Sequence, residues 1–519
     1  MQVLNASLMA SDKTYRPIGY AWLGDTFKVN AMPHHVESFV AEPGERKIVE
    51  QADGRRREIH PWSAIKLETA CDHLAFALKR EGLHLELLRA VLPQVAAAEV
   101  AAFVRATPTG ATARRLWYLW ERFTSKTLDI PDVSIGNYIA LADPEVYYTG
   151  HEARHPRWRI VNNLIGNIHF SPMLRRSPRL VHWDVAGLAE KCKQVLDQYP
   201  VKLYQRALSW LYSKETKSSY AIEQEVPDET RTGKFIGLLR AAGEQDYFSE
   251  KALCTLQQAI VDPRFASPTF RTTQNFVGQT LAPGVEEVHL VPPKPGKDLT
   301  FLMESWAKVS HDLATHSHIP PVPAAAIVAY LFVFFHPFID GNGRIHRFLI
   351  HHVLARRKFG PEGIVFPVSA VMLNRPADYD ASLEAFSLPL KARSEYTLTE
   401  LNEMTVTNKT LDHFRYIDCT VMAEALCSFV AETIEKELPR ELAFLRCYDI
   451  ARAAMREVVD LPEPHANLFL KLALQNQGRL SKKKRSIPQF EKLTNDEITG
   501  LEDAIRTAYA DHMPEPGTL

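Results

Sequence analysis

The densest apolar segment of the chain, residues 324–335, is followed directly by a histidine and a proline. Its aliphatic and aromatic residues predict a helix buried on most faces, and Pro337 disfavours helical geometry at His336, so the helix should end there. A second helical pattern begins at Ile345, just after a glycine-rich turn. The pattern therefore predicts two core helices joined by a short loop, with a histidine at the end of the first.

Outside this pair, the same periodicities predict a mainly α protein with two small β elements. Strand-like runs at 20–23 and 47–50, the second followed by the turn pair Asp53-Gly54, predict a small N-terminal β element. Residues 270–293 lack helical periodicity and predict a hairpin with a long turn. Helices are expected from Pro61 to about Pro178 and at 183–211, 299–313, 378–388, 411–438 and 441–459. The C-terminal part predicts a helix at 465–477, a basic turn at 480–485 and a helix at 496–509, an order that suggests a winged-helix type.

A chain of 519 residues is long enough for about three to four domain-sized units. We expect a core that holds both central helices and the hairpin, preceded by a helical segment and an N-terminal region and followed by a helical extension. The expected boundaries are 1–180 for the N-terminal region, 181–245 for the helical segment, 246–400 for the core and 401–519 for the helical C-terminal domain.

The charge balance and the cysteine content limit the kinds of protein that this chain can be. The 61 basic and 62 acidic residues leave a formal charge of −1, so no overall field attracts nucleic acid or an anionic membrane. The six cysteines form no C-x-x-C pair and are expected to be reduced thiols. Residues 1–13 lack the basic start and apolar stretch of a signal peptide, and the run 322–335 is shorter than the roughly 20 residues of a membrane helix. We therefore expect a cytoplasmic protein that is not bound to a membrane.

The loop between the two core helices concentrates residues suited to phosphate binding. Gly341, Asn342 and Gly343 accept left-handed dihedrals just before a helix, where successive backbone N–H groups form an anion nest. Arg344 and Arg347 lie three apart in the first turn of that helix, where the positive end of the helix dipole disfavours cations. An anionic ligand with more than one phosphate would offset that cost.

Two further side chains in the loop supply a metal ligand and a base. The carboxylate of Asp340 is a hard oxygen ligand suited to a magnesium ion that otherwise keeps waters and phosphate oxygens. His336, with an unperturbed pKa of about 6.5, is largely neutral in the cytosol and can accept a hydroxyl proton. These residues favour metal-assisted transfer from a nucleoside polyphosphate to a hydroxyl. The run lacks both the Gly-Lys-Ser/Thr of a P-loop and the acidic spacing of a calcium loop.

The whole loop resembles, position for position, the signature of the Fic family, H-P-F-x-D-G-N-G-R-x-x-R. The resemblance implies a Fic-type helical bundle with a β-hairpin flap, and transfer of AMP from ATP-Mg to a Ser, Thr or Tyr hydroxyl of a target protein. It makes His336 the base and Asp340 the metal ligand. It also implies that residues 341–343 cradle the phosphates and that Arg344 and Arg347 clamp the outer ones.

The resemblance covers about residues 218–393 and implies three further features. Gly341 and Gly343 stand where relatives that phosphorylate their targets carry Ala and Lys, which favours nucleotidyl transfer here. Tyr379 lines the adenine pocket by analogy, with a core tyrosine as the alternative. The hairpin at 270–293 corresponds to the flap over the active site, where an exposed edge aligns a target segment by strand addition; a plain surface hairpin is the alternative. Relatives also suggest a homodimer.

Upstream of the loop, Ser219 and Glu223 stand four apart, on one helical face. Physics alone favours a helix start with Ser218 or Ser219 as N-cap and a solvated Glu223. The segment also resembles the inhibitory helix of Fic proteins, S/T-x-x-x-E-G/N, of the class with the inhibitor N-terminal in the same chain. The resemblance implies that Glu223 pairs with Arg347, so that ATP binds only in a non-productive pose. Gln224 departs from the family pattern, which usually has Gly or Asn there.

Two other functions stay open at this point. The same site could remove AMP from a modified target, with Glu223 positioning a water. Alternatively, the loop could bind a nucleotide without turnover in a sensing protein that contacts DNA or another protein. The basic run 482–485 invites the DNA interpretation, although a solvated loop is favoured. The pattern does not decide between ATP, UTP and GTP as donor.

Two other groups of residues have a structural and a functional interpretation. The aromatics at 117–120 lie among arginines and could stack bases, but core packing is favoured. His346, His351 and His352 could suggest a transition-metal site. Because adjacent residues on a helix point in different directions, satisfied helical histidines are favoured.

Overall fold

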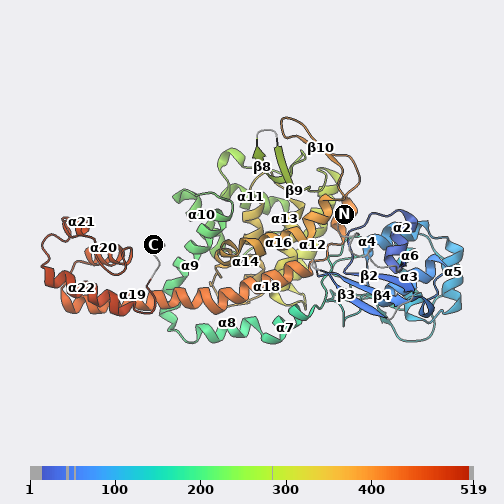
Figure 1. Ribbon diagram of the computed structural model, residues 1–519, viewed down its shortest axis with the longest axis horizontal. Helices are drawn as coiled ribbons and strands as arrows, with labels where there is room; N and C mark the ends of the chain where they lie inside the picture. Colours follow the sequence, from blue (N-terminus) through green and yellow to red (C-terminus); the bar gives the residue numbers. More distant parts are fainter. Residues whose placement is uncertain (1–13, 43–45, 52–53, 283–284, 514–519) are drawn as a thin grey trace. The chain divides into compact units, whose positions relative to one another are not determined.

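The computed structural model describes residues 14–42, 46–51, 54–282 and 285–513. Helices dominate these residues, and the strands form small sheets and hairpins (Figure 1). The expected mainly α fold with a β-hairpin, a small N-terminal β element and a helical C-terminal region is confirmed.

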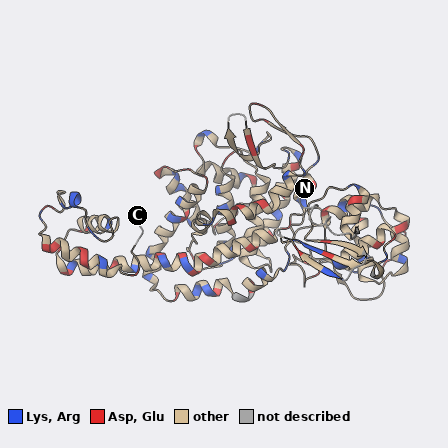
Figure 2. Ribbon diagram, in the orientation of Figure 1, with Lys and Arg blue, Asp and Glu red and all other residues tan. Residues whose placement is uncertain are grey.

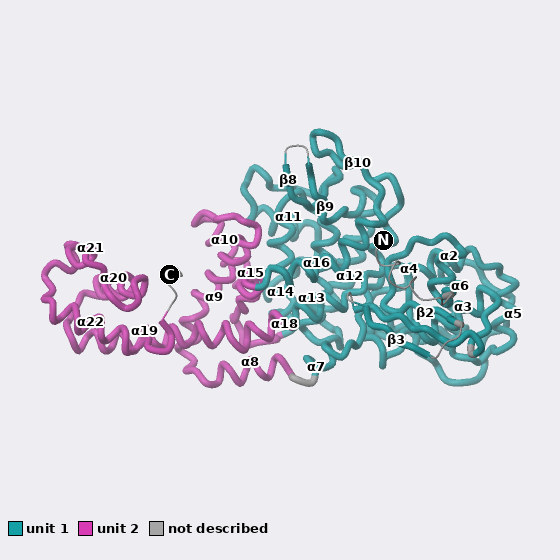
Figure 3. The backbone as a smooth tube through the Cα atoms, viewed as in Figure 1, with its two compact units in different colours: residues 1–185, 241–357, 375–427 teal, residues 186–240, 358–374, 428–519 magenta. Residues whose placement is uncertain are grey.

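The chain divides into two compact units that do not follow chain order (Figure 3). The expected domain boundaries at 180, 245 and 400 stay a prediction. Unit 1 comprises residues 1–185, 241–357 and 375–427, and unit 2 comprises residues 186–240, 358–374 and 428–519.

Unit 1 begins with a four-stranded sheet of β1 (Thr14–Ile18), β2 (Val36–Glu42), β3 (Lys47–Glu50) and β4 (Arg56–Pro61). The strand order is β1-β2-β4-β3, with β2 and β4 parallel and the other pairs antiparallel. The turn expected after residues 47–50 joins β3 to β4, and the Gly54 N–H donates to the Gln51 carbonyl at 3.0 Å. Asp53, the other residue of the expected turn pair, lies outside the described residues.

The strand expected at residues 20–23 is wrong, because these residues lie in helix α2 (Gly19–Phe27). Tyr20 and Leu23 are both buried and stand three positions apart, which places them on one helical face. A run of four apolar or aromatic residues is too short to separate a period of 2 from a period of 3.6. The helix packs this face onto the helices that follow.

Those helices begin later than expected, at Ala70 instead of Pro61, because Thr69 and Asp72 form a capping box there. The aromatics at 117–120 are buried, so they belong to the core and not to a base-stacking surface. The helices are α3 (Ala70–Arg80), α4 (Leu85–Val91), α5 (Ala97–Ala106) and α6 (Ala111–Thr124).

The expectation of helix as far as Pro178 is wrong for residues 125–177. This part is mostly irregular, and its prolines and glycines interrupt the backbone pattern that a helix needs. Short 3₁₀ turns, η1 (Trp62–Ala64), η2 (Leu92–Gln94) and η3 (Pro156–Trp158), occur in this half of the unit. A three-stranded sheet also forms, from β5 (Ile139–Ala140), β6 (Ala153–His155) and β7 (Ile160–Asn162).

The two central helices predicted from the sequence are α13 (Pro321–Phe335) and α14 (Asn342–Arg356). Every residue of α13 except Pro321 and Val333 is buried, so this helix ends inside the core. Trp306, on a neighbouring helix, donates its Nε1–H to the Val328 carbonyl of α13 at 2.9 Å and so links that helix to α13. The surrounding elements are α11 (Glu250–Ile260), η4 (Pro263–Phe265), α12 (Lys297–Thr315) and α16 (Pro376–Lys391).

Two β-hairpins belong to the same unit. The expected hairpin at 270–293 forms from the antiparallel strands β8 (Val277–Ala282) and β9 (Val285–Leu290). A second hairpin, β10 (Tyr396–Leu398) and β11 (Met404–Val406), was not expected, because strands of three residues are too short to show a period. The single helix expected at 411–438 is interrupted at 416–419, which separates α17 (Leu411–Arg415) from α18 (Thr420–Glu432).

Unit 2 is helical, with a π-helical turn, η5 (Thr433–Glu437), just before Pro439. A proline ring clashes with the carbonyl one turn earlier, so the helix widens at this place. The Glu215 carboxylate accepts from the Ser369 backbone N–H at 2.9 Å and joins two of the helices. The helices are α7 (Pro178–Ala186, at the boundary with unit 1), α8 (Leu188–Leu196), α9 (Val201–Ile222), α10 (Glu229–Arg240), α15 (Val368–Asn374), α19 (Leu438–Val458), α20 (Glu463–Leu474), α21 (Lys482–Arg485) and α22 (Asn495–Ala508).

In the part of the chain that the structure describes, no single helix is both long and apolar enough to cross a membrane. One pair, residues 85–94 and 97–106, bent by 110°, meets the requirement by length and composition only. All six cysteines are free and buried.

His352 on α14 gives the core a measurable pH dependence. Its Nδ1 lies 2.6 Å from the Ala242 carbonyl, so Nδ1 carries the proton. Burial lowers the pKa of His352 to about 4, whereas the unfolded histidine has a pKa of about 6.5. As pH falls, the unfolded chain therefore binds the proton first, and the free energy of unfolding decreases between about pH 6.5 and pH 4.

The variant His352→Asn keeps an N–H donor for Ala242 and removes the titrating group. Between pH 7 and pH 4.5 it should lose less unfolding free energy than the unaltered protein, by at least about 1 kcal/mol. Urea denaturation at both pH values measures the difference. Equal losses in the two proteins would contradict this account.

Candidate active site

The loop between α13 and α14 places His336 in a strained backbone conformation at the end of α13. Its φ of 49° lies in the left-handed region, and its N–H still donates to the Phe332 carbonyl at 3.0 Å. The ring nitrogen Nδ1 lies 3.3 Å from the Val333 carbonyl, which can only accept, so Nδ1 is the protonated nitrogen. Nε2 then carries the lone pair. The local geometry thus suits His336 to accept a proton through Nε2.

Asp340 lies four residues further along the loop. Its Oδ1 accepts from the Gly341 N–H at 2.6 Å and from Arg344 Nη2 at 2.6 Å. The Asp340 side chain is 34% exposed whereas that of Arg344 is 2% exposed. The carboxylate therefore balances a buried guanidinium on one side and stays accessible to a cation on the other.

No group of three or more His, Cys, Asp or Glu side chains within the described ranges could hold a metal ion. The histidines 346, 351 and 352 therefore form no such group among the described residues. Magnesium commonly binds through one or two carboxylates and takes its other ligands from water and phosphate oxygens. Asp340 fits a site of that kind.

Gly341 is the N-cap of α14 and adopts a φ of 92°. A Cβ atom at this position would lie 2.8 Å from Val261 Cγ1, so both conformation and space call for glycine. Asn342 closes the loop instead of pointing outward: its Oδ1 accepts from the Phe338 N–H at 3.0 Å and its Nδ2 donates to the Phe338 carbonyl at 2.8 Å. What Asn342 and Gly343 can offer a ligand is the backbone N–H groups at the start of α14.

Arg344 and Arg347 are both 1% exposed, in the first turns of α14. Arg344 also reaches the Ile260 carbonyl, with Nη1 at 3.4 Å. Two buried guanidinium groups beside a helix N-terminus concentrate positive charge, which favours an anionic ligand. The loop and the first turns of α14 carry His336, Asp340, Gly341, Asn342, Gly343, Arg344 and Arg347. Their assignment to one site stays a prediction.

Arg271, which sequence reasoning missed, holds the loop from the side of the hairpin. It is 5% exposed, and its Nε donates to the His336 carbonyl at 2.8 Å. Its Nη1 donates to the Thr273 carbonyl at 3.0 Å and its Nη2 to the Pro293 carbonyl at 2.5 Å. The Arg271 backbone N–H donates to the Pro337 carbonyl at 2.8 Å. Burial lowers the pKa of Arg271 to about 10, which leaves it charged at neutral pH.

Two amide side chains from outside the loop donate to further loop carbonyls. Asn275 Nδ2 donates to the Phe338 carbonyl at 3.1 Å, and Gln257 Nε2 donates to the Asp340 carbonyl at 3.2 Å. Gln257 is fully buried on α11, and a glutamine on the apolar face of an amphipathic helix is a signal that the sequence does carry. Arg271 lies in an irregular segment with no period, so no comparable signal marks it.

Tyr379 on α16 is 6% exposed, and its ring centre lies 6.1 Å from that of the buried His346. Its assignment to an adenine pocket stays a prediction beside this core packing.

Ser219 and Glu223 belong to unit 2, at the end of α9. This helix begins at Val201, so residues 218 and 219 do not start a helix, and the N-cap interpretation is wrong. Ser219 is buried and Glu223 is the C-cap. Gln224 follows with a φ of 57°, the left-handed conformation that glycine and asparagine adopt most easily. The proposed inhibitory role of Ser219 and Glu223 stays a prediction.

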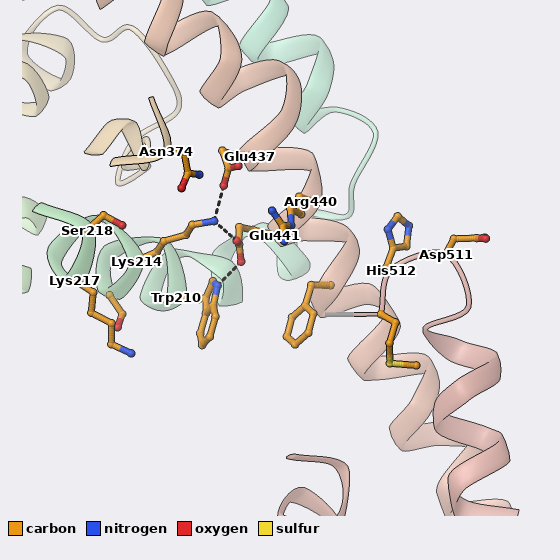
Figure 4. A pocket seen from close by; sticks show the side chains of 13 residues that line it. Trp210, Lys214, Lys217, Ser218, Asn374, Glu437, Arg440, Glu441, Asp511 and His512 are labelled. Atoms are coloured by element: carbon orange, nitrogen blue, oxygen red, sulfur yellow. Dashed lines mark hydrogen bonds and ion pairs between the residues drawn. The ribbon is translucent and has the colours of Figure 1, made fainter. Parts of the chain in front are cut away.

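A cavity of about 590 Å³ lies within unit 2 (Figure 4). At its wall, Lys214 donates to Glu437 at 2.6 Å and also to Glu441, which accepts from Trp210 Nε1 as well. These polar groups satisfy one another, and no residue of the loop lines this cavity. In unit 1, a second cavity of about 610 Å³ adjoins Arg271 and the first half of α12. We therefore assign the candidate site to the loop and not to the cavity of unit 2.

Residues 247–354 match the family model described as Fic/DOC family. Similar curated proteins include the protein adenylyltransferase Fic of Drosophila ananassae, 39% identical over 104 residues, which are 20% of this chain and 18% of that protein. The protein adenylyltransferase Fic of Culex quinquefasciatus is 34% identical over 124 residues, 23% of this chain and 22% of that one. The chain thus spans only about a fifth of the length of these relatives.

Solved structures that are similar to the chain include a Fic family protein and a Fic domain containing protein. A Fic family protein from Desulfovibrio desulfuricans G20 aligns with a TM-score of 0.39 and 16% identity, over 62% of this chain and 96% of that one. A Fic domain containing signaling protein from Bacteroides thetaiotaomicron aligns with a TM-score of 0.35 and 19% identity, over 50% of this chain and 95% of that one.

The hold of Arg271 on the loop can be tested by Arg271→Met. The change leaves three carbonyl oxygens without this donor, and an unsatisfied buried acceptor costs about 1–3 kcal/mol. We expect the free energy of unfolding to fall by about 2–4 kcal/mol, and amide exchange to accelerate most in β8 and β9. Hydrogen exchange and urea denaturation measure both effects.

Arg264→Met is the matched control. The Arg264 side chain is 80% exposed, and its ion pair is a local one, with Asp262 two residues away. It should leave stability and exchange nearly unchanged. Equal effects of the two changes would show that Arg271 does not hold the hairpin.

Proposed function

Residues 247–354 form a Fic/DOC-family domain, and from this we propose that the protein is an adenylyltransferase. It moves AMP from ATP to a Ser, Thr or Tyr hydroxyl of a target protein, with Mg²⁺ at the site. The observation that carries the proposal is the loop within that domain, in which the Nδ1 of His336 is turned to the Val333 carbonyl and Asp340 is paired with Arg344.

In the proposed reaction, the target hydroxyl oxygen bonds to the α-phosphorus of ATP. The bond from that phosphorus to the oxygen bridging to the β-phosphate breaks, pyrophosphate leaves, and the hydroxyl proton passes to His336 Nε2. Asp340 would hold a magnesium ion, and that ion would neutralise part of the phosphate charge. The N–H groups at 341–343 and the guanidinium groups of Arg344 and Arg347 bind the phosphates, so that positioning and charge stabilisation carry most of the rate.

We further propose that Glu223 restrains this activity by pairing with Arg347. The motif from Ser219 to Glu223 supports this, as does the left-handed Gln224, which takes the place of the usual Gly or Asn. A carboxylate on Arg347 would occupy the group that the γ-phosphate needs, so ATP would bind in a non-productive pose. Displacement of Glu223 would then release transfer.

The proposed partner is the target protein, docked along the flap at 270–293. In the structure as described, β8 pairs only with β9, so its outer edge suits strand addition by an extended target segment. A homodimer stays a prediction. So does nucleic-acid binding by residues 482–485: Lys482, Lys483 and Lys484 are exposed at α21 (Figure 2), while Arg485 pairs with Glu502 at 2.8 Å.

Incorporation of labelled AMP from ATP-Mg, into the protein itself and into a cell lysate, tests both proposals. We expect Glu223→Gly to raise labelling at least about tenfold, the usual size of such coupling. Adding His336→Ala to it should lower labelling by about a hundredfold or more, because the base is lost. The unaltered chain should label weakly.

Glu225→Gly is the matched control, since Glu225 stands two residues beyond Glu223 and pairs with Arg231 at 3.4 Å. It should leave labelling low. Release of AMP from a modified target, abolished by Glu223→Gly, would favour the removal reaction instead. No labelling by any variant with ATP, UTP or GTP would sink the transferase proposal and favour a nucleotide-sensing protein.

A further inference from the structure

The flap does not stand alone, because the hairpin β10–β11 lies beside it (Figures 1 and 3). Buried Val288 on β9 packs with Met404 and Val406 on β11. The Asn402 side chain donates to Glu286 Oε1 at 3.0 Å and joins the end of the second hairpin to the flap. We call β8, β9 and residues 394–408 together the double-hairpin surface.

This surface has an open strand edge and an apolar tip. All residues of β8 after Val277 are exposed. Leu281 is 60% exposed, Val285 50% and Leu401 83%. Single exposed apolar residues are ordinary, but these three lie near the point where Asn402 joins the two hairpins. An extended segment that pairs with β8 could bury an aliphatic side chain there.

The negative charge of the double-hairpin surface favours the binding of a positively charged segment. There is no Lys or Arg in residues 277–282, 285–290 and 394–408. The five glutamates in these residues give a formal charge of −5, whereas the formal charge of the whole chain is −1. Among the described residues none of the five pairs with a Lys or Arg, and Figure 2 marks β9 as acidic. The glutamates are Glu286, Glu287, Glu395, Glu400 and Glu403.

The same surface is connected to the candidate base. Arg271 donates to the carbonyls of Thr273 and Pro293, at the two ends of the flap, and to the carbonyl of His336. A segment bound along the flap is therefore held on the same framework as the base.

We propose that the double-hairpin surface binds an extended, basic segment of the target protein. The segment pairs its backbone with β8, places Lys or Arg side chains against the glutamates, and buries an aliphatic side chain against Leu281, Val285 and Leu401. The proposal rests on the proposed function, because it names the substrate class of the same site.

The test uses the full chain and two labelled peptides of twelve residues, followed by fluorescence anisotropy. In the first peptide, lysines alternate with leucines around one serine, and in the second each lysine is replaced by glutamate. We expect the lysine peptide to bind at least about tenfold more tightly. Glu400→Lys with Glu403→Lys should weaken its binding about tenfold, and added salt should weaken it too.

Glu145→Lys with Glu152→Lys is the matched control, because both carboxylates are exposed in unit 1 and the change in charge is the same. It should leave binding of the lysine peptide unchanged. Equal binding of the two peptides, or equal loss in the two double variants, would overturn the proposal. We call the protein with Glu400→Lys and Glu403→Lys the hairpin variant. If this variant changed its oligomeric state but not its peptide binding, the surface would be an interface between copies of the chain, and the proposal would be overturned as well.

Peptide binding needs no nucleotide, so it fails independently of transfer. In the Glu223→Gly background, the hairpin variant should raise the KM for the lysine peptide about tenfold while kcat and the KM for ATP-Mg stay unchanged. Binding without any labelling would sink the transferase proposal and leave the docking surface intact. If labelling occurs and the hairpin variant leaves the KM for the lysine peptide unchanged, the docking proposal is overturned and the transferase proposal stands.

Discussion

A helix that ends inside the core leaves carbonyl groups that must find donors there, and this constraint shapes the candidate site. The chain leaves α13 at a left-handed His336, and the side chains of the loop itself bond only part of its backbone groups. Side chains from outside the loop donate to further carbonyls, chiefly those of Arg271, Asn275 and Gln257. The positions of the His336, Phe338 and Asp340 carbonyls and the attachment of the hairpin follow from where these donors lie.

Charge imposes a second condition on the same place. Burying the guanidinium of Arg344 is costly unless a carboxylate compensates it, and Asp340 provides that partner at 2.6 Å. The carboxylate is then shared between holding Arg344 in place and any cation that approaches from solvent. A site built in this way is arranged for an anionic ligand before the ligand arrives, which lowers the reorganisation that binding requires.

The sequence predicted what depends on local rules and missed what depends on distant contacts. The loop residues from His336 to Arg347 follow one another in the chain, so the sequence alone placed them in one loop between two helices. Tyr20 and Leu23 were assigned to a strand because four residues cannot define a period, and β10–β11 escaped notice for the same reason. Arg271 could not be found, because its importance comes from three carbonyls, two of them more than twenty residues away in the chain.

The close approach of Gly341 to Val261 also has an evolutionary consequence. Any side chain at 341 must tolerate a φ of 92° and would meet Val261 Cγ1 at 2.8 Å. Alanine, which relatives that phosphorylate carry here, would need both a backbone change and a smaller neighbour. A substitution at 341 would therefore require the Val261 side chain to move or to be replaced by a smaller one. The backbone at the start of α14 is thus restricted by a valine that lies outside the loop.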